Sequence, residues 1–210
     1  MDSDVYLLHN SSTMSSFIDT LKGIDTDILL FINGHNSPLL DQIMIIISGR
    51  FTWIPLYLLF AVMIIRDYRK GAILIIIFGG LAVLLSDQAA NIIKDHVMRY
   101  RPSHNLLLTG KIHLYKDADG GSYMGGMYGF VSNHAANAAS IATYLILLFR
   151  RKFVTWILIP WVILVCYSRM YLGVHYPFDV FCGILLGIVT GSIAHKSCML
   201  LQRGSSLSDA

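Results

Sequence analysis

Long apolar runs alternate with short polar segments along most of the chain. Five runs of 15 to 17 residues contain almost no charged side chain: 51–65, 71–85, 135–149, 153–167 and 178–194. A helix of 15 residues is about 22 Å long, whereas the hydrocarbon core of a bilayer is about 30 Å thick, so flanking residues must complete each span. The pattern predicts an all-α, polytopic membrane helix bundle with about five transmembrane helices.

Three of these runs extend into polar residues. The second continues through Ser86 and Asp87 to Lys94, the third begins near His134, and the fourth continues to Arg169. Polar side chains at membrane depth are tolerated where they face the bundle interior or a wet cavity. These helix ends are therefore the first place to look for chemistry.

The two ends of the chain differ from its centre. Residues 1–42 are predicted to form an N-terminal interfacial segment. Within it, 17–32 mix Leu, Ile and Phe with Asp and Lys. This mixture fits a helix on the membrane surface and a buried helix of the soluble type equally well. A transmembrane domain follows over 43–198. Its first span either begins at Ile43 or is preceded by a short helix at 42–48. The Gly- and Ser-rich residues 199–210 predict a disordered tail.

Composition supports a bilayer as the main solvent. Hydrophobic residues make up 55% of the 210 residues and charged residues only 14%, and the mean hydropathy is +0.59. Soluble domains usually carry about a quarter charged residues. A net charge of +3, without a basic stretch that contains aromatics, argues against a nucleic-acid partner. All 13 acidic residues are Asp, so any general acid, base or orienting carboxylate must be Asp.

Basic residues in the expected loops predict the orientation. With five spans, one face receives Arg66, Arg69, Lys70, Arg150, Arg151, Lys152, Lys196 and Arg203. Cytoplasmic loops carry an excess of Lys and Arg, so this face is expected in the cytoplasm. The N-terminus, the long segment 95–133 and the turn 170–177 are then expected on the opposite face.

Three polar groups are expected together on that opposite face. They are Lys94-x6-Arg101-Pro102 after the second span, Ser132-Asn133-His134 before the third, and Ser168-Arg169-x5-His175-x3-Asp179 between the fourth and fifth. A single charge at membrane depth costs about 2.5 to 3.5 kcal/mol, so three cations close together require a strong anion. Arginine forks and helix N-termini both suit phosphate, and the Ser132 hydroxyl adds a donor. The residues predict a phosphate site.

Two histidines and one aspartate add the groups that phosphate transfer needs. Pro177 is expected at the first position of the fifth helix, which places Asp179 in its first turn, within reach of His175. A carboxylate on one ring nitrogen orients the imidazole and makes the other nitrogen a better nucleophile. His175 is then expected to attack phosphorus and form a phosphohistidine, while His134 protonates the departing oxygen.

On these residues the chain resembles the type 2 phosphatidic acid phosphatase family, which shares its site with vanadium haloperoxidases. Its first and third motifs are present in full, and the resemblance covers about 43–194. The second motif, Pro-Ser-Gly-His in the family, reads Val131-Ser132-Asn133-His134 here. Asn133 is expected to tolerate a left-handed backbone where the family has Gly.

The resemblance implies His175 as nucleophile, Asp179 as its partner and His134 as acid, with phosphate bound by Lys94, Arg101, Ser132, Asn133 and Arg169. It implies no metal and no cofactor. It also implies a bacterial enzyme of the cytoplasmic (inner) membrane, with its site facing the periplasm or cell exterior. The expected partners are the bilayer and a phosphorylated lipid, with undecaprenyl diphosphate or lipid A favoured over phosphatidic acid and phosphatidylglycerol phosphate.

Several alternatives remain open from sequence alone. A polytopic transporter, or a non-catalytic binder of phosphorylated lipids, would also gather cations, whereas a haloperoxidase is expected to be soluble. Arg99 and His96 are interpreted as loop residues, and Asp87 either pairs with Lys94 or faces the bundle interior. Residues 120–129 are expected to form a flexible flap above the site. The sequence predicts no oligomeric state.

Overall fold

The computed structural model describes the backbone of residues 2–208 and the side chains of residues 16–202, and its regular structure is helical. The elements in chain order are α1 (Asp2–Gly34), α2 (Pro38–Ser48), α3 (Ile54–Tyr68), the short 3-10 helix η1 (Arg69–Gly71), α4 (Ala72–Val97), the 3-10 helices η2 (Pro102–His104) and η3 (Leu106–Leu108), α5 (Asn133–Phe149), α6 (Lys152–Tyr171) and α7 (Pro177–Ser208). The described backbone forms two isolated β-bridges but no strand. The predicted all-α class is confirmed.

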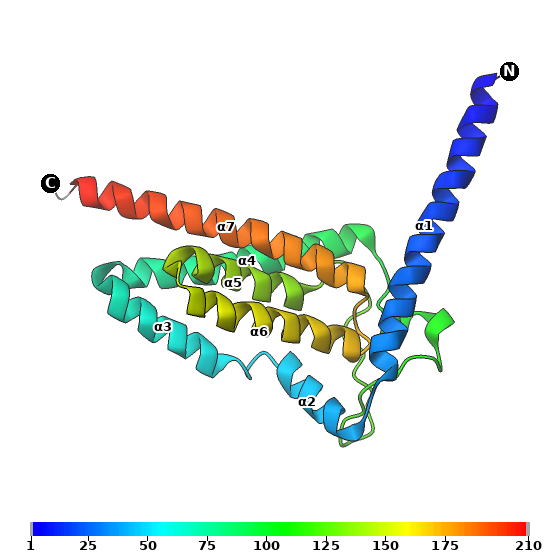
Figure 1. Ribbon diagram of the computed structural model, residues 1–210, viewed down its shortest axis with the longest axis horizontal. Helices are drawn as coiled ribbons and strands as arrows, with labels where there is room; N and C mark the ends of the chain where they lie inside the picture. The colour runs from blue at the N-terminus through cyan, green and yellow to red at the C-terminus, as the bar shows by residue number, and fades with distance from the viewer. Residues whose placement is uncertain (1, 209–210) are drawn as a thin grey trace.

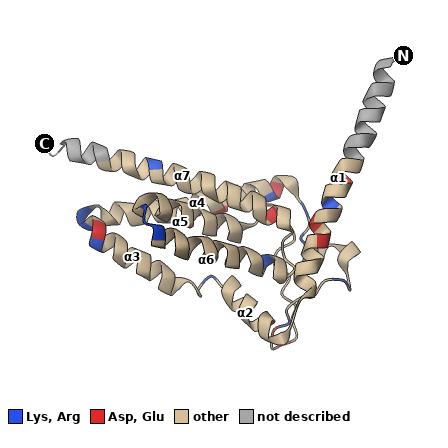
Figure 2. Ribbon diagram, viewed as in Figure 1, with Lys and Arg blue, Asp and Glu red and all other residues tan. Residues whose placement is uncertain are grey.

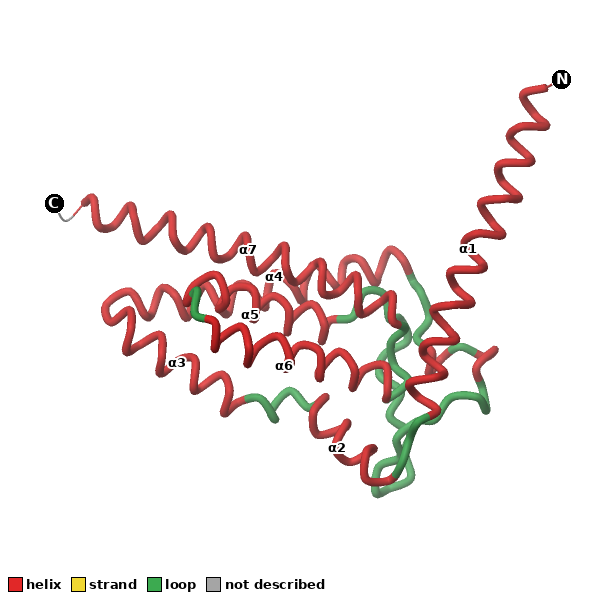
Figure 3. Tube along the Cα trace, in the orientation of Figure 1, coloured by secondary structure: helices red, strands yellow, loops and turns green. Residues whose placement is uncertain are grey.

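Helices α3 to α7 run roughly side by side and form a bundle (Figures 1 and 3). Among the described residues, three segments are long and apolar enough to cross a membrane: Ile54–Val97, Lys152–Tyr171 and Pro177–Gln202. The first of these contains α3 and α4, which fold back on each other at η1 (Figure 1). The 17-residue α5 packs against α4, α6 and α7. The chain is a helical membrane protein, and the number of five spans stays a prediction.

The outer surface of the bundle is apolar. Side chains such as Val62, Ile73, Trp156 and Ile163 are 62 to 78% exposed. Lys, Arg and Asp are concentrated at the two ends of the bundle and are rare along its length (Figure 2). An apolar surface of this extent is unfavourable in water and suits contact with lipid chains.

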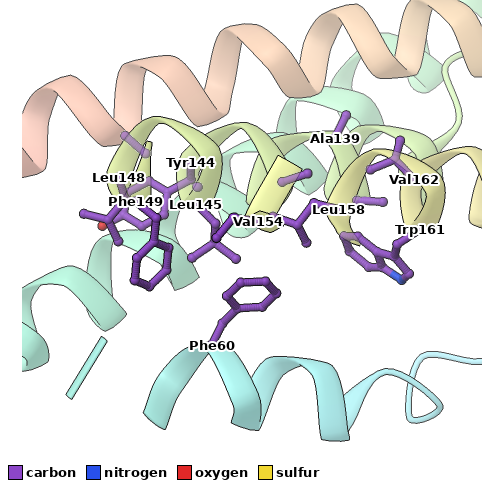
Figure 4. Packing of buried hydrophobic residues seen from close by; sticks show 14 of the residues in the cluster. Phe60, Ala139, Tyr144, Leu145, Leu148, Phe149, Val154, Leu158, Trp161 and Val162 are labelled. Atoms are coloured by element: carbon purple, nitrogen blue, oxygen red, sulfur yellow. The ribbon is translucent and has the colours of Figure 1, made fainter. Parts of the chain in front are cut away.

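The interior of the bundle is packed by α3, α5 and α6. Phe60 of α3 faces Leu145 and Phe149 of α5 and Leu158 of α6 (Figure 4). Two buried hydroxyls of α5 donate to carbonyls of α4: Tyr144 to Ile75 at 2.8 Å and Ser140 to Ala82 at 3.0 Å. Such hydrogen bonds satisfy polar groups that no water reaches.

Small residues bring α5 and α7 into close contact. A Cβ atom at Gly183 would come within 2.7 Å of the carbonyl oxygen of Ser132, and one at Gly187 would overlap the carbonyl oxygen of Ala136. Glycines four residues apart place the backbones of two membrane helices against each other. This seam joins the helix that begins at the second motif to the helix that carries Asp179.

Local signals explain where the helices near the site begin and end. Ser37 caps α2, its hydroxyl accepting from the N–H of Leu40 at 3.3 Å, and α2 ends before Gly49. A separate short helix therefore precedes the first span, which decides between the two alternatives that the sequence left open. Pro177 opens α7, as predicted.

Helix α1 crosses the site end of the bundle at a steep angle (Figure 1). Asp25, Leu29 and Asn33 form its buried stripe, whereas Phe17 and Leu21 are exposed. A buried polar stripe and an exposed apolar face suit a helix on a membrane surface, and that location stays a prediction. At the other terminus, α7 continues to Ser208, so the backbone of 199–208 is helical where a disordered tail was expected; the side chains of 203–210 lie outside the described residues.

Candidate active site

The three polar groups lie at one end of the bundle, beside α1. Lys94 lies in the last turn of α4, Ser132 caps α5, Arg169 lies in the last turn of α6, His175 lies in the α6–α7 connection, and Asp179 lies in the first turn of α7. Arg101 follows α4 and reaches the same place. The structure therefore brings together residues that are up to 85 positions apart in the chain.

The imidazole of His175 is at the centre of the group and only 1% exposed. Arg101 Nη1 lies 3.0 Å from its Nε2. A guanidinium can only donate, so Nε2 accepts and the ring proton is on Nδ1. Burial, followed by the charges of Arg101, Arg169 and Lys94, lowers the pKa of His175 well below 6.5. The ring is therefore neutral with its lone pair on Nε2, the form that a nucleophile requires.

Asp179 lies next to this ring without bonding to it. Its Oδ2 is 3.7 Å from His175 Nδ1, and that nitrogen has no hydrogen-bond partner among residues 16–202. The backbone N–H of Tyr176 instead donates to Oδ2 at 3.0 Å. The expected contact between the two residues is thus a close approach and not a hydrogen bond.

Arg99 corrects one interpretation from the sequence. It was interpreted as a loop residue, but its Nη1 donates to Oδ1 of Asp179 at 2.7 Å, and its Nη2 donates to Oδ2 of Asp25 at 2.6 Å. The sequence contains a hint of this role, because Arg99 is a further cation beside the first motif and a buried cation needs a partner of opposite charge. Its partner on α1 could not be found from spacing. His96, by contrast, is exposed at the end of α4.

Arg169 is held by two residues that the sequence analysis missed. Its side chain is 1% exposed, and its Nη1 donates to the hydroxyl of Ser48 and, at 3.1 Å, to that of Tyr123. Its buried Nε has no partner among residues 16–202. A buried donor without a partner is costly, so a phosphate oxygen would suit it.

The other two cations are less enclosed. Arg101 Nε donates to the carbonyl of Tyr128 at 3.1 Å, and burial, followed by repulsion from Arg169, lowers the pKa of Arg101 to about 10. Lys94 is half-buried and makes no ion pair within residues 16–202. Lys94 therefore keeps its charge available for an anion.

The glycine-rich segment 120–129 lies against these arginines, as expected for a flap. The N–H of Gly129 donates to the carbonyl of Arg99 at 2.8 Å, and Gly125, with φ +68°, leaves no space for a side chain next to Arg101. Burial would raise the pKa of Tyr123, but the charge and hydrogen bond of Arg169 outweigh it, and the pKa is lowered. The flexibility of this segment stays a prediction.

The second motif opens α5. Ser132 is fully buried, and its hydroxyl accepts from the N–H of Ala135 at 3.5 Å, so it acts as the N-cap. His134 follows in the first turn, near enough to Arg169, His175 and Arg101 for their charges to act on it. The N-terminus of α5 thus points its free N–H groups and its dipole toward the arginines.

Asn133 differs from its expected role in two ways. Its side chain donates to Asp87 Oδ1 at 2.8 Å and to Asn91 at 2.9 Å, so the amide is engaged with α4 instead of lying free for phosphate. It is the first residue of α5 and does not have a positive φ, so the left-handed explanation is wrong. Asp87 also accepts from Asn137 at 3.1 Å. Asp87 therefore joins two helices and does not form an ion pair with Lys94.

The fold and this group of residues define a polytopic membrane protein in which Lys and Arg side chains surround a buried histidine. The profile of the PAP2 superfamily matches residues 72–201, and the chain belongs to that family. The match includes all three motifs.

Known proteins agree with this assignment. The chain is 35% identical over 175 residues to a lipid A 4'-phosphatase of Porphyromonas gingivalis, covering 82% of this chain and 72% of the relative. It is 31% identical over 169 residues to an undecaprenyl-diphosphatase of Sulfolobus acidocaldarius, covering 79% and 74%. The crystal structure of Aquifex aeolicus LpxE superposes with a TM-score of 0.62 at 25% identity, covering 81% of this chain and 94% of that one.

Proposed function

We propose that the protein is a membrane phosphatase that removes phosphate from a lipid, with the phosphate of lipid A as the favoured substrate. One observation carries the proposal: a buried neutral imidazole has its Nε2 lone pair among the cations Arg101, Arg169 and Lys94. A site of this kind attracts a phosphoryl group and offers it a nucleophile at the same point.

The reaction proceeds in two displacements. His134 takes up a proton as the anionic phosphate binds beside it. Nε2 of His175 then attacks phosphorus, the bond between phosphorus and the lipid oxygen breaks, and His134 gives that oxygen its proton. Water then attacks the phosphohistidine, His134 takes a proton from it, and inorganic phosphate leaves with the Nε2 lone pair restored to His175. The cations bind the equatorial oxygens in both steps, where charge develops. The proposed steps use side chains of this chain alone.

A lipid substrate is supported by the surroundings of the site. The catalytic end lies on a bundle with an apolar outer surface. A groove of about 560 Å³ between α1 and the start of α7 is lined by apolar residues, among them Ile28, Phe130 and Phe181, and reaches Asp25 and Arg99. The relative from Porphyromonas gingivalis supports lipid A, and the one from Sulfolobus acidocaldarius keeps undecaprenyl diphosphate as the second candidate.

The location proposed for the site is the outer side of a bacterial inner membrane. Arg66, Arg69 and Lys70 lie at the α3–α4 turn, and Arg150 and Arg151 at the α5–α6 turn, which is the bundle end opposite the site (Figure 2). An excess of basic loop residues favours the cytoplasm. The site at the other end would then face the periplasm or the cell exterior.

Phosphate release in detergent, with EDTA present, tests the proposal. Lipid A, undecaprenyl diphosphate and phosphatidic acid are assayed side by side, and the favoured order has lipid A first. His175→Ala should lower kcat by at least about 10³-fold, because the covalent step is lost. His96→Ala is the matched control and should keep wild-type turnover, since His96 is exposed. Wild-type kcat in His175→Ala, or turnover that requires added Mg²⁺ or Zn²⁺, contradicts the mechanism.

A further inference from the structure

Arg99 joins two carboxylates from different parts of the chain. One end of its guanidinium is 2.7 Å from Oδ1 of Asp179, and the other end is 2.6 Å from Oδ2 of Asp25 on α1. The side chains of Asp179, Asp25 and Arg99 are 0%, 10% and 25% exposed. Water therefore screens these ion pairs only weakly, and losing one partner would leave a buried charge uncompensated.

The same contacts hold the α6–α7 connection around His175. Oδ1 of Asp25 accepts from the N–H of Phe178 at 2.8 Å, next to Asp179. The guanidinium of Arg99 lies over the ring of Tyr176, 4.0 Å from its centroid, next to His175. A residue on α1 and a residue after α4 thus both contact the short stretch that carries the nucleophile and its carboxylate.

The two oxygens of Asp179 have different neighbours. Oδ1 accepts from Arg99, the only side chain among residues 16–202 that donates to this carboxylate, whereas Oδ2 accepts from the backbone N–H of Tyr176 and is the oxygen nearest to His175 Nδ1. A carboxylate that is held by hydrogen bonds keeps its free direction fixed, and residues that hold a catalytic side chain in this way orient it for the reaction. Both ends of the Arg99 fork donate to carboxylates, so its charge is already paired with Asp179 and Asp25.

We propose that Arg99 and Asp25 are positioning residues, which hold Asp179 with Oδ2 toward His175 and so make α1 part of the catalytic assembly. The role rests on the proposed phosphatase function. It assigns to an N-terminal helix, outside the segment that matches the family, a direct share in the geometry of the nucleophile.

The test compares kinetics of the full-length protein in detergent on a lipid phosphate. Arg99→Gln should lower kcat by about 10²-fold and leave KM within about twofold, because phosphate binding is untouched. Arg99→Lys should recover part of the loss, since it restores the charge without the fork. Asp25→Asn alone should lower kcat by about fivefold. Adding Asp25→Asn to the Arg99→Lys variant should lower kcat by less than about a further twofold, because the effects of residues in contact are not additive. The inhibition constant of inorganic phosphate, which reports binding of the anion without the covalent step, should stay unchanged throughout.

Asp27→Asn is the matched control, because Asp27 lies on the same helix but is exposed, and it should keep wild-type kcat. Thermal melting of each variant checks folding, and if Arg99→Gln does not fold, Asp25→Asn decides. Wild-type kcat in Arg99→Gln, or in a folded Asp25→Asn, overturns the positioning role. Weaker inhibition by inorganic phosphate with unchanged kcat would also overturn it, since Arg99 would then bind phosphate. Absence of wild-type turnover overturns the proposed function, and this role falls with it.

Discussion

Replacing Arg169 with lysine separates the shape of this cation from its charge. The guanidinium uses Nη1 for Ser48 and Tyr123, and its buried Nε remains as a donor. In the proposed complex it can therefore bind phosphate while it stays anchored. A lysine ammonium keeps the charge but has one nitrogen, so it cannot serve the anchors and the phosphate with the same fork geometry.

The expected magnitude follows from the contact that is lost. A hydrogen bond to a charged group contributes about 1.5 to 3 kcal/mol. Because about 1.4 kcal/mol corresponds to a factor of ten in rate, kcat/KM in Arg169→Lys should fall about 10- to 150-fold. The substituted side chain is about as long and remains charged, so the free energy of unfolding should change less than it would for an apolar replacement.

The assay is phosphate release from a lipid phosphate over a range of substrate concentrations, with thermal melting of both proteins in the same detergent. Arg66→Lys is the matched control, because this arginine is 80% exposed at the opposite end of the bundle. It should keep wild-type kcat/KM. The reasoning would be refuted by an Arg169→Lys protein within twofold of wild type, since the fork would then have no part in binding phosphate.

Two further predictions concern protonation and the second motif. Burial and neighbouring cations hold the pKa of His175 well below 6.5, so its neutral form persists as the pH falls through that value. The acid limb of the pH profile of kcat/KM should therefore lie below pH 6.5. An acid limb centred above pH 6.5 would contradict this prediction. Asn133→Gly restores the family residue but removes two hydrogen bonds to α4, so the free energy of unfolding should fall by about 1 to 3 kcal/mol while kcat stays within about threefold. Chemical denaturation and steady-state kinetics check both parts, and a large loss of kcat in a folded Asn133→Gly would return this side chain to the substrate site.

Much of the site could be predicted because local patterns determine it. Apolar runs place the helices, Pro177 sets the start of α7, and fixed spacings put Lys94 and Arg169 in last turns. Positive side chains at the same membrane depth then imply that they bind one anion together. These inferences need no knowledge of which helices touch.

The missed residues depend on contacts between distant segments. Ser48 and Tyr123 meet Arg169 across 121 and 46 positions, and no spacing rule links them. Asp25 is 74 positions from Arg99 and lies in a segment where surface and buried helices fitted equally well. Asn133 was interpreted through backbone conformation, whereas its side chain is used between α4 and α5. Tertiary packing decided each case.

The glycine seam between α5 and α7 has a consequence for the environment in which the protein works. Membranes differ in thickness, and spanning helices respond by tilting. Since these two helices meet backbone to backbone, a tilt of one must be shared by the other. We therefore expect the separation between His134, at the start of α5, and Asp179, at the start of α7, to change little with the composition of the host bilayer.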